Sequence, residues 1–341
     1  MRGLAIFARS SRGLRAALRG HLRAAAVVLA VLGPGLSVPA MAEYPERPLQ
    51  MIIPFPAGGP ADIVGRLYAQ QLATQLGQPV SVLNRDGAAG IIGTQAAARA
   101  NPDGYTLAFG TTSTMAINPI IMKNVPYDFF RDFGLVGLIA NAPHILAVRD
   151  GLPARSATEL VALAGRSPGK YTFASAGLGT IVQMGGELFK HEAAIDILHV
   201  PYKGGGPATL ALLAGEVDMT VNDLTTLKAN FAAGKLRPLA VAHANRLKLL
   251  PEVPTFAELG MPRIVSSTWW GVAVPAATPA PILARLKAAN ARIVADPDYV
   301  ARLAALAVEP LALGPEQSAA FIAGEVQKWK GVAAAANIRL E

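Results

Sequence analysis

Short aliphatic segments alternate with segments of helical periodicity along most of this chain. Residues 60–76 carry apolar side chains at every fourth position from Val64 to Leu76, which places them on one face of a helix. The strand-like runs LQMIIPF and VSVLN flank this segment. Because strands that alternate with helices build a parallel sheet covered by helices, the pattern predicts an α/β fold.

The alternation occurs in two series, which predicts two domains. The second series begins with the strand HILAVRD and a helix opened by Ser156 and Glu159 at capping-box spacing. After WWGVAVP the chain becomes mainly helical. We expect the chain to cross between domains near residues 139–147 and 266–274, with Trp269 and Trp270 packed near the second crossing. The predicted first domain comprises 43–142 and 270–341, with the C-terminal helices packed on it, and the second comprises 143–269.

The net charge of +8 comes mostly from the first 42 residues. They hold six of the 31 Lys and Arg and no acidic residue, so the remainder carries 25 basic and 23 acidic residues. A near-neutral remainder implies no nucleic-acid partner. The chain contains no cysteine, so we expect its stability to come from core burial and not from disulfides.

The same first 42 residues have the layout of a secretory signal peptide. A basic start is followed by the apolar run 24–32 and by Ala40 and Ala42 in an A-x-A arrangement. The run is shorter than the roughly 20 residues that span a bilayer. We therefore expect cleavage after Ala42 and a periplasmic mature protein; a retained amphipathic helix is the alternative.

A loop rich in glycine and proline follows a strand-like run twice, in IIPFPAGGPAD and in HVPYKGGGPAT. Ligands of parallel α/β sheets collect where such loops lead from strands into helices. Gly59 is expected to cap a helix that begins at Pro60, and Gly206 with Pro207 to repeat this arrangement. A glycine cap leaves the first helical amides free to bind an anion. The alternative is that both loops are only tight turns.

Two further segments place polar groups at strand ends. In ASAGLGTIVQ, Ser175 and the glycines leave the backbone open to a ligand, whereas Thr180 and Gln183 are spaced so that they could instead satisfy their own helix end. The run GTTST, residues 110–114, ends another strand with hydroxyl groups, which are also common in ordinary turns.

The sequence offers little support for catalysis. It contains neither a G-x-x-x-x-G-K-[ST] phosphate loop nor a strand-linked G-x-G-x-x-G. Ser175 lies in FASAG, which lacks the first glycine of a nucleophile elbow. The histidines are scattered and cysteine is absent, so no metal site is predicted. We expect no enzyme activity, cofactor or metal; a periplasmic hydrolase that uses Ser175 is the alternative.

Ordered motifs from Tyr44 to the C-terminus include YPERPLQMIIPFPAGGPAD, NRDGAAGIIGTQAAARANPDGYTL, SAGLGT, VPYKGGGPATLALLAGEVDM, LPEVPTFAELG and WWGVAVPAATP. In these motifs the chain resembles the Bug family, the extracytoplasmic solute receptors of tripartite tricarboxylate transporters. The resemblance implies an α/β, two-domain Venus flytrap fold with a hinge of two chain crossings. It also implies a small carboxylated solute in the cleft, membrane transporter subunits as partners, no cofactor and a monomeric state. A receptor that signals to a sensor protein is the alternative.

The resemblance places the first-domain binding loop at 55–62 and the second-domain contacts at 175–180 and 202–206. Gln183 stands where many relatives carry histidine, and the segment 220–223 replaces a more apolar form, so the identity of the ligand stays open. The predicted ligand-binding residues are Phe55, Ala57, Gly58, Gly59, Asp62, Thr111, Thr112, Ser113, Ser175, Gly177, Thr180, Gln183, Tyr202, Gly204, Gly205 and Asp223.

Overall fold

The computed structural model describes residues 44–339, of which those from Arg47 onward form one compact unit. The predicted signal peptide, 1–42, lies outside the described residues. Among the helices of 44–339, none combines the length and the apolar character that a membrane span requires.

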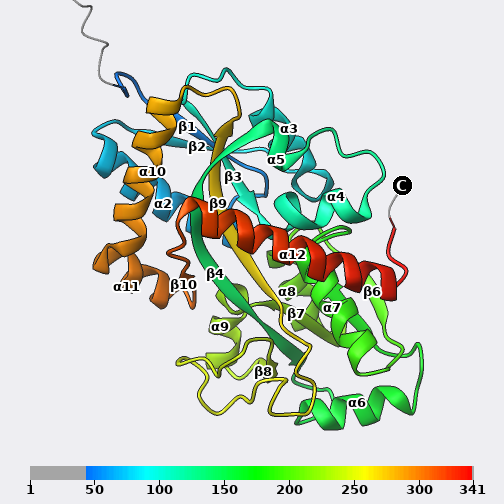
Figure 1. The fold of residues 1–341 in the computed structure, drawn as a ribbon. Coiled ribbons are helices and arrows are strands. Elements are labelled where there is room, and N and C mark those ends of the chain that lie inside the picture. The colour runs from blue at the N-terminus through cyan, green and yellow to red at the C-terminus, as the bar shows by residue number, and fades with distance from the viewer. Residues whose placement is uncertain (1–43, 340–341) are drawn as a thin grey trace, which may run out of the picture. The chain divides into compact units, whose positions relative to one another are not determined.

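Three parallel strands and two helices form a first strand group (Figure 1). The elements are β1 (Leu49–Ile53), α2 (Pro60–Leu76), β2 (Val80–Asn84), α3 (Ile91–Ala98) and β3 (Thr106–Thr111). The predicted helix 60–76 is confirmed residue for residue. The short elements η1 (Ala88–Gly90), η2 (Ser113–Ile117), α4 (Asn118–Ile121) and α5 (Phe129–Asp132) complete this part of the chain.

Three more parallel strands, a fourth strand that pairs with β4 (Phe133–Arg149), and four helices form a second strand group. Its elements are α6 (Ala157–Gly165), β5 (Thr172–Ser175), α7 (Ile181–Glu192), β6 (Leu198–Pro201), α8 (Gly205–Ala214), β7 (Met219–Asp223), α9 (Leu224–Ala232) and β8 (Leu236–Val241). The predicted cap of α6 is confirmed, because Ser156 Oγ accepts a hydrogen bond from the Glu159 amide at 3.1 Å.

Two long strands join the groups, β4 (Phe133–Arg149) and β9 (Ser267–Pro275). The first part of β4 pairs with β9, and the part from His144 onward pairs with β7 and β8. The strand order is β2-β1-β3-β9-β4-β7-β5-β6, and β4 and β9 run side by side between the two groups (Figure 1). The prediction of a parallel sheet is therefore wrong for β4 and β9, which are antiparallel to their neighbours. Antiparallel pairing needs no helical crossover, so the helix pattern cannot reveal it.

The last part of the chain is mainly helical, as expected: α10 (Ala280–Ala295), α11 (Pro297–Ala305), the short β10 (Glu309–Pro310) and α12 (Pro315–Ala335). Helix α12 crosses in front of both long strands in Figure 1. Its residue Ile322 belongs to an apolar core with Ile52 of β1, whereas Trp329 belongs to one with Phe173 of β5. The helix therefore contacts both strand groups. The domain boundaries given above stay a prediction.

Candidate ligand-binding site

A cavity of about 190 Å³ is lined by loops of both strand groups. Its walls come from the loops that follow β1, β3, β5 and β6 and from the ends of β7 and β9. These loops are where the sequence predicted a ligand, at the carboxyl ends of parallel strands. The predicted residues that line the cavity are Phe55, Ala57, Gly58, Gly59, Thr111, Ser113, Thr180, Gly204, Gly205 and Asp223.

A second, larger hollow of about 500 Å³ adjoins this cavity. The two share Phe55, Lys203 and Gly204, and the hollow is also lined by the predicted residues Gly177 and Tyr202. Asp62, Thr112, Ser175 and Gln183, which were also predicted to bind ligand, line neither space.

Two helices begin at the cavity without a side-chain cap. Helix α2 has Gly59 as its N-cap and Pro60 as its first residue, as predicted. Helix α8 begins at Gly205 with Gly204 as its N-cap, so the prediction that Gly206 caps this helix is wrong by two residues. Pro207 is then the third helical residue, where the first turn still requires no intrahelical amide donor. The first amides of both helices carry the positive end of the helix dipole and are available to an anion.

The Asp62 carboxylate stabilises the loop that follows β1 through hydrogen bonds. Its carboxylate accepts hydrogen bonds from the Gly58 amide at 3.0 Å, Arg66 Nε at 2.9 Å and Asn84 Nδ2 at 2.9 Å. Burial opposes ionisation, but the hydrogen bonds from Arg66, Gly58 and Asn84 prevail and lower the pKa of Asp62 below its usual value. Asn84 also donates to the Phe55 carbonyl at 3.0 Å, so hydrogen bonds hold the loop at Phe55 as well as at Gly58.

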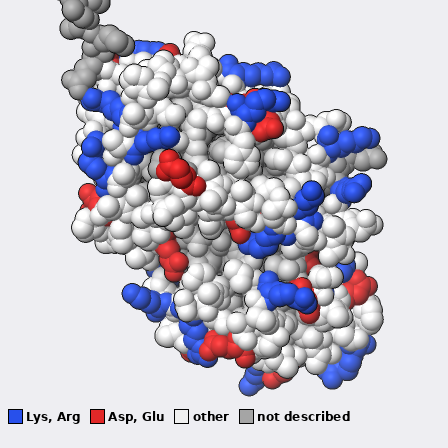
Figure 2. All heavy atoms as spheres, in the orientation of Figure 1, with Lys and Arg blue, Asp and Glu red and all other residues white. Residues whose placement is uncertain are grey.

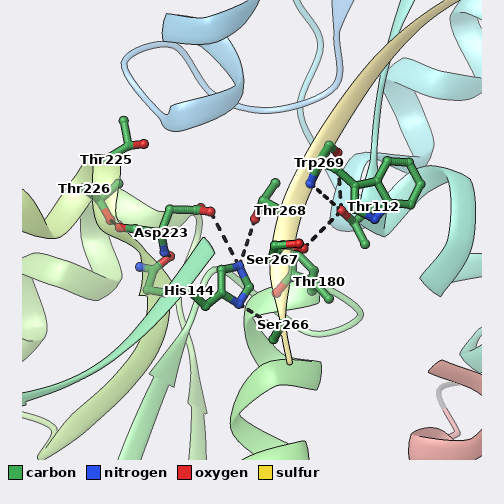
Figure 3. Close-up of polar contacts among 12 residues, drawn as sticks. Thr112, His144, Thr180, Asp223, Thr225, Thr226, Ser266, Ser267, Thr268 and Trp269 are labelled. Carbon is green, nitrogen blue, oxygen red and sulfur yellow. Dashed lines mark hydrogen bonds and ion pairs between the residues drawn. The ribbon is translucent and has the colours of Figure 1, made fainter. Parts of the chain in front are cut away.

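Hydroxyl and amide side chains fix the remaining loops. Thr180 Oγ1 accepts from the Gln183 amide at 3.4 Å, and Gln183 Oε1 accepts from the Gly179 amide at 2.7 Å. Ser113 Oγ accepts from the Ile181 amide at 3.1 Å and so links the two strand groups at the cavity. Thr112 Oγ1 accepts from the Trp269 amide at 2.8 Å (Figure 3). The side chains of Gln183 and Thr112 thus accept hydrogen bonds from backbone amides of the loops at the site. Thr180 caps its own helix, which is the alternative that its spacing with Gln183 allowed.

Ser175 contacts a histidine that the sequence did not reveal as its partner. Its Oγ lies 2.6 Å from His199 Nε2 and also accepts from the Gly177 amide at 3.1 Å. The two residues are brought together because Thr172–Ser175 pairs in parallel register with Leu198–Pro201. Ser175 is fully buried, and burial lowers the pKa of His199 to about 4. This pair lies beneath the loop that follows β5 and does not line the cavity.

His199 is expected to make the protein less stable as the pH falls from 6.5 to 4. In this window the unfolded chain binds a proton at His199 that the folded chain does not, because the folded pKa is about 4. A single such group contributes at most about 1.4 kcal/mol per pH unit, and the partial exposure of His199 reduces the pKa shift and so narrows the pH window in which this slope applies. His199→Gln is therefore expected to flatten the plot of unfolding free energy against pH by roughly this slope. Urea denaturation at several pH values measures it.

The control for this measurement is His191→Gln, since His191 is exposed on α7. It is expected to keep the slope of the wild type. Equal slopes for the wild type and His199→Gln would contradict the assignment.

Several residues of the cavity wall were not predicted as ligand contacts. Asn222 is the penultimate residue of β7, and Thr268 and Trp270 lie on β9; Lys203, which also lines the cavity, lies within the predicted contact range 202–206. Asn222 Nδ2, Asp223 Oδ1 and Trp270 Nε1 are buried and have no hydrogen-bond partner in the described part of the chain. Polar residues that end a strand in TVND were the available sequence signal for Asn222. Within residues 44–339, no group of three or more His, Asp or Glu side chains is placed to hold a metal ion.

Comparisons with known proteins identify the family of this chain. Residues 64–338 match the family described as tripartite tricarboxylate transporter family receptor. The periplasmic binding protein BugD is 32% identical, with a TM-score of 0.81 over 87% of this chain and 100% of BugD. Rpa4515 of R. palustris with adipate is 32% identical, with a TM-score of 0.84 over 87% of this chain and 99% of that one.

A third structure, MatC of Rhodopseudomonas palustris with bound malate, is 30% identical, with a TM-score of 0.79 over 85% of this chain and 99% of MatC. Each of these three structures covers at least 85% of this chain. The chain therefore belongs to the Bug family of tripartite tricarboxylate transporter receptors, which are periplasmic solute-binding proteins with a two-domain α/β fold.

Proposed function

We propose that this protein captures a small organic acid through a carboxylate and delivers it to the membrane subunits of a tripartite tricarboxylate transporter. The observation that supports it best is that α2 and α8 both begin at one cavity with glycine caps that supply no side-chain acceptor. The two relatives described above are bound to adipate and malate, which are both carboxylates. The proposal includes export by the predicted signal peptide and a monomeric receptor.

The charge distribution favours recognition by local dipoles over long-range attraction. Lys and Arg are interspersed with Asp and Glu on the face seen in Figure 2, with no broad field of one sign. Inside the cavity, a favourable helix end contributes up to about 2 kcal/mol to an anion that is partly buried. Two such ends, with the exposed Lys203 at the cavity wall, favour a carboxylate over a neutral group.

A hydrolase that uses Ser175 is the second candidate, because Ser175 Oγ lies 2.6 Å from His199 Nε2. A hydroxyl that attacks a substrate must reach it, whereas Ser175 is fully buried and lies outside the cavity lining. The geometry therefore favours a structural contact.

Carboxylic acids are expected to raise the melting temperature of the protein, and the corresponding amides are not. A ligand present at 100 times its Kd stabilises the folded state by about 2.7 kcal/mol, a shift of several degrees. The amide lacks the negative charge that the helix ends prefer. A thermal-shift screen of matched acids and amides, followed by analysis of the recovered compounds, measures both binding and turnover.

Equal shifts from acid and amide would contradict a carboxylate site. Conversion of the amide to the acid, lost in Ser175→Ala, would instead support the hydrolase. Uptake of the bound acid by cells that hold the transporter, and its loss when the receptor is deleted, distinguishes delivery from signalling to a sensor.

A further inference from the structure

Asp223 contributes a buried carboxylate to the cavity wall. Only 4% of the residue is exposed, and its Oδ1 has no hydrogen-bond partner among the described residues. It is the N-cap residue of α9, yet its side chain makes no capping bond. Its backbone amide instead donates to Asn222 Oδ1 at 2.8 Å. The carboxylate therefore neither caps α9 nor accepts a hydrogen bond through Oδ1 from the described residues.

The nearest charged or titratable partner is His144, and its ring is already engaged. His144 Nε2 lies 3.5 Å from Asp223 Oδ1, a separation too long for a strong hydrogen bond. The same nitrogen lies 3.0 Å from Thr268 Oγ1, and Nδ1 lies 2.9 Å from Ser266 Oγ (Figure 3). His144 thus leaves the carboxylate only partly satisfied. Buried polar groups in native proteins are nearly always hydrogen-bonded. Asp223 Oδ1 therefore needs a donor that the described residues do not supply.

Two neighbouring groups are hydrogen-bond donors that lack an acceptor. Asn222 Nδ2 and Trp270 Nε1 are donors on residues that are fully buried, and neither has an acceptor in the described part of the chain. Both residues line the same cavity as Asp223. A ligand that fits this wall must therefore present acceptor oxygens to Asn222 and Trp270 and a donor to Asp223.

A plain dicarboxylate does not satisfy this wall. It offers acceptors alone, and a second negative charge beside Asp223 is repelled strongly where water is excluded. A hydroxyl group both donates and accepts, and an ammonium group donates while it also neutralises the charge of Asp223. Building on the proposed function, we propose that the ligand is a small carboxylate that bears a hydroxyl or ammonium group, and that Asp223 recognises this donor.

The test compares probes that differ in one substituent. Succinate, malate and aspartate share a four-carbon skeleton and carry hydrogen, hydroxyl or ammonium at one carbon; glutarate, 2-hydroxyglutarate and glutamate form the five-carbon set. Calorimetry on the full mature chain is expected to show that a donor-bearing member of one set binds at least about tenfold tighter than its unsubstituted parent. Preference for the hydroxy acid or for the amino acid identifies which donor Asp223 accepts.

Asp223→Asn is expected to reverse this order. The amide loses the negative charge, so the donor-bearing probe should bind at least about tenfold more weakly, while the unsubstituted parent should bind more tightly than it does to the wild type. Asn is similar in size, and the side chain of Asp223 caps no helix, so the fold should be retained. The control is Asp196→Asn, since Asp196 is exposed and outside the cavity lining; it should leave all affinities unchanged.

Tight binding of succinate or glutarate without preference for the substituted probes would overturn the inference and leave the proposed carboxylate receptor intact. An unchanged preference in Asp223→Asn would also overturn it. Binding of none of the six acids would contradict the proposed function itself.

Discussion

Gly59→Val and Gly205→Val are each expected to weaken binding of the organic acid at least about tenfold, roughly 1.4 kcal/mol, while the free energy of unfolding stays near that of the wild type. Both glycines line the cavity at the start of a helix, Gly59 as the N-cap of α2 and Gly205 as the first residue of α8. A branched side chain there would occupy the space in which a carboxylate approaches the free amides. Calorimetry measures the affinity, and urea denaturation measures the stability.

The geometry indicates that the fold tolerates these changes. A Cβ atom at Gly59 would meet only the Pro56 carbonyl oxygen at 3.5 Å, and one at Gly205 would meet Asn222 Nδ2 and Thr226 Cγ2 at 3.6 Å. These are ordinary contacts, and neither glycine has a positive φ. Gly204 is different, because its φ of +109° would strain any side chain.

Gly324→Val on α12 is the matched control, because Gly324 is exposed and a Cβ atom there would meet nothing within 4 Å. It is expected to leave the affinity unchanged. Normal affinity in a stably folded Gly205→Val variant would show that the second loop is a structural turn and that the start of α8 does not bind the carboxylate.

The features that the sequence predicted correctly are those with local causes. The bounds of α2 follow from Pro60 at its first position and from the apolar periodicity that ends before Gly77, which adopts a left-handed conformation as the C-cap. The capping residues Ser156 and Thr180 were likewise visible, because each bonds to an amide three residues away. Two glycine loops at strand ends also led to the cavity.

The errors and omissions depend on contacts between distant segments. Asn141 and Pro143 interrupt the apolar run before HILAVRD, so only the second half of β4 was recognised as a strand; its first half is defined by pairing with β9. Gly205 and Gly206 were placed before the helix by analogy with Gly59 and Pro60, yet they open α8. The unpartnered atoms of Asn222 and Trp270 could not be foreseen, because an absent partner is a property of the folded surroundings.

Glu325→Ala is expected to lower the free energy of unfolding by roughly 3–5 kcal/mol. Glu325 Oε2 accepts hydrogen bonds from Trp269 Nε1 at 3.1 Å and from Trp329 Nε1 at 3.0 Å, and both tryptophans are fully buried. Removing the carboxylate leaves two buried N–H groups without an acceptor, each at a cost of about 1–3 kcal/mol. Lys328, which pairs with the other carboxylate oxygen, loses its partner as well. Urea denaturation measures the change.

Trp269 lies on β9 and Trp329 on α12 itself, so the carboxylate joins α12 to β9 and also holds Trp329, which belongs to the apolar core that includes Phe173. Glu325→Gln keeps a carbonyl acceptor of similar reach and is expected to lose less than half as much stability, because the indole N–H groups retain a partner. Glu316→Ala, at an exposed position of the same helix, should change the free energy by less than about 0.5 kcal/mol. A loss below about 1 kcal/mol in Glu325→Ala would mean that water replaces the carboxylate at both indoles and that α12 is held by apolar packing alone.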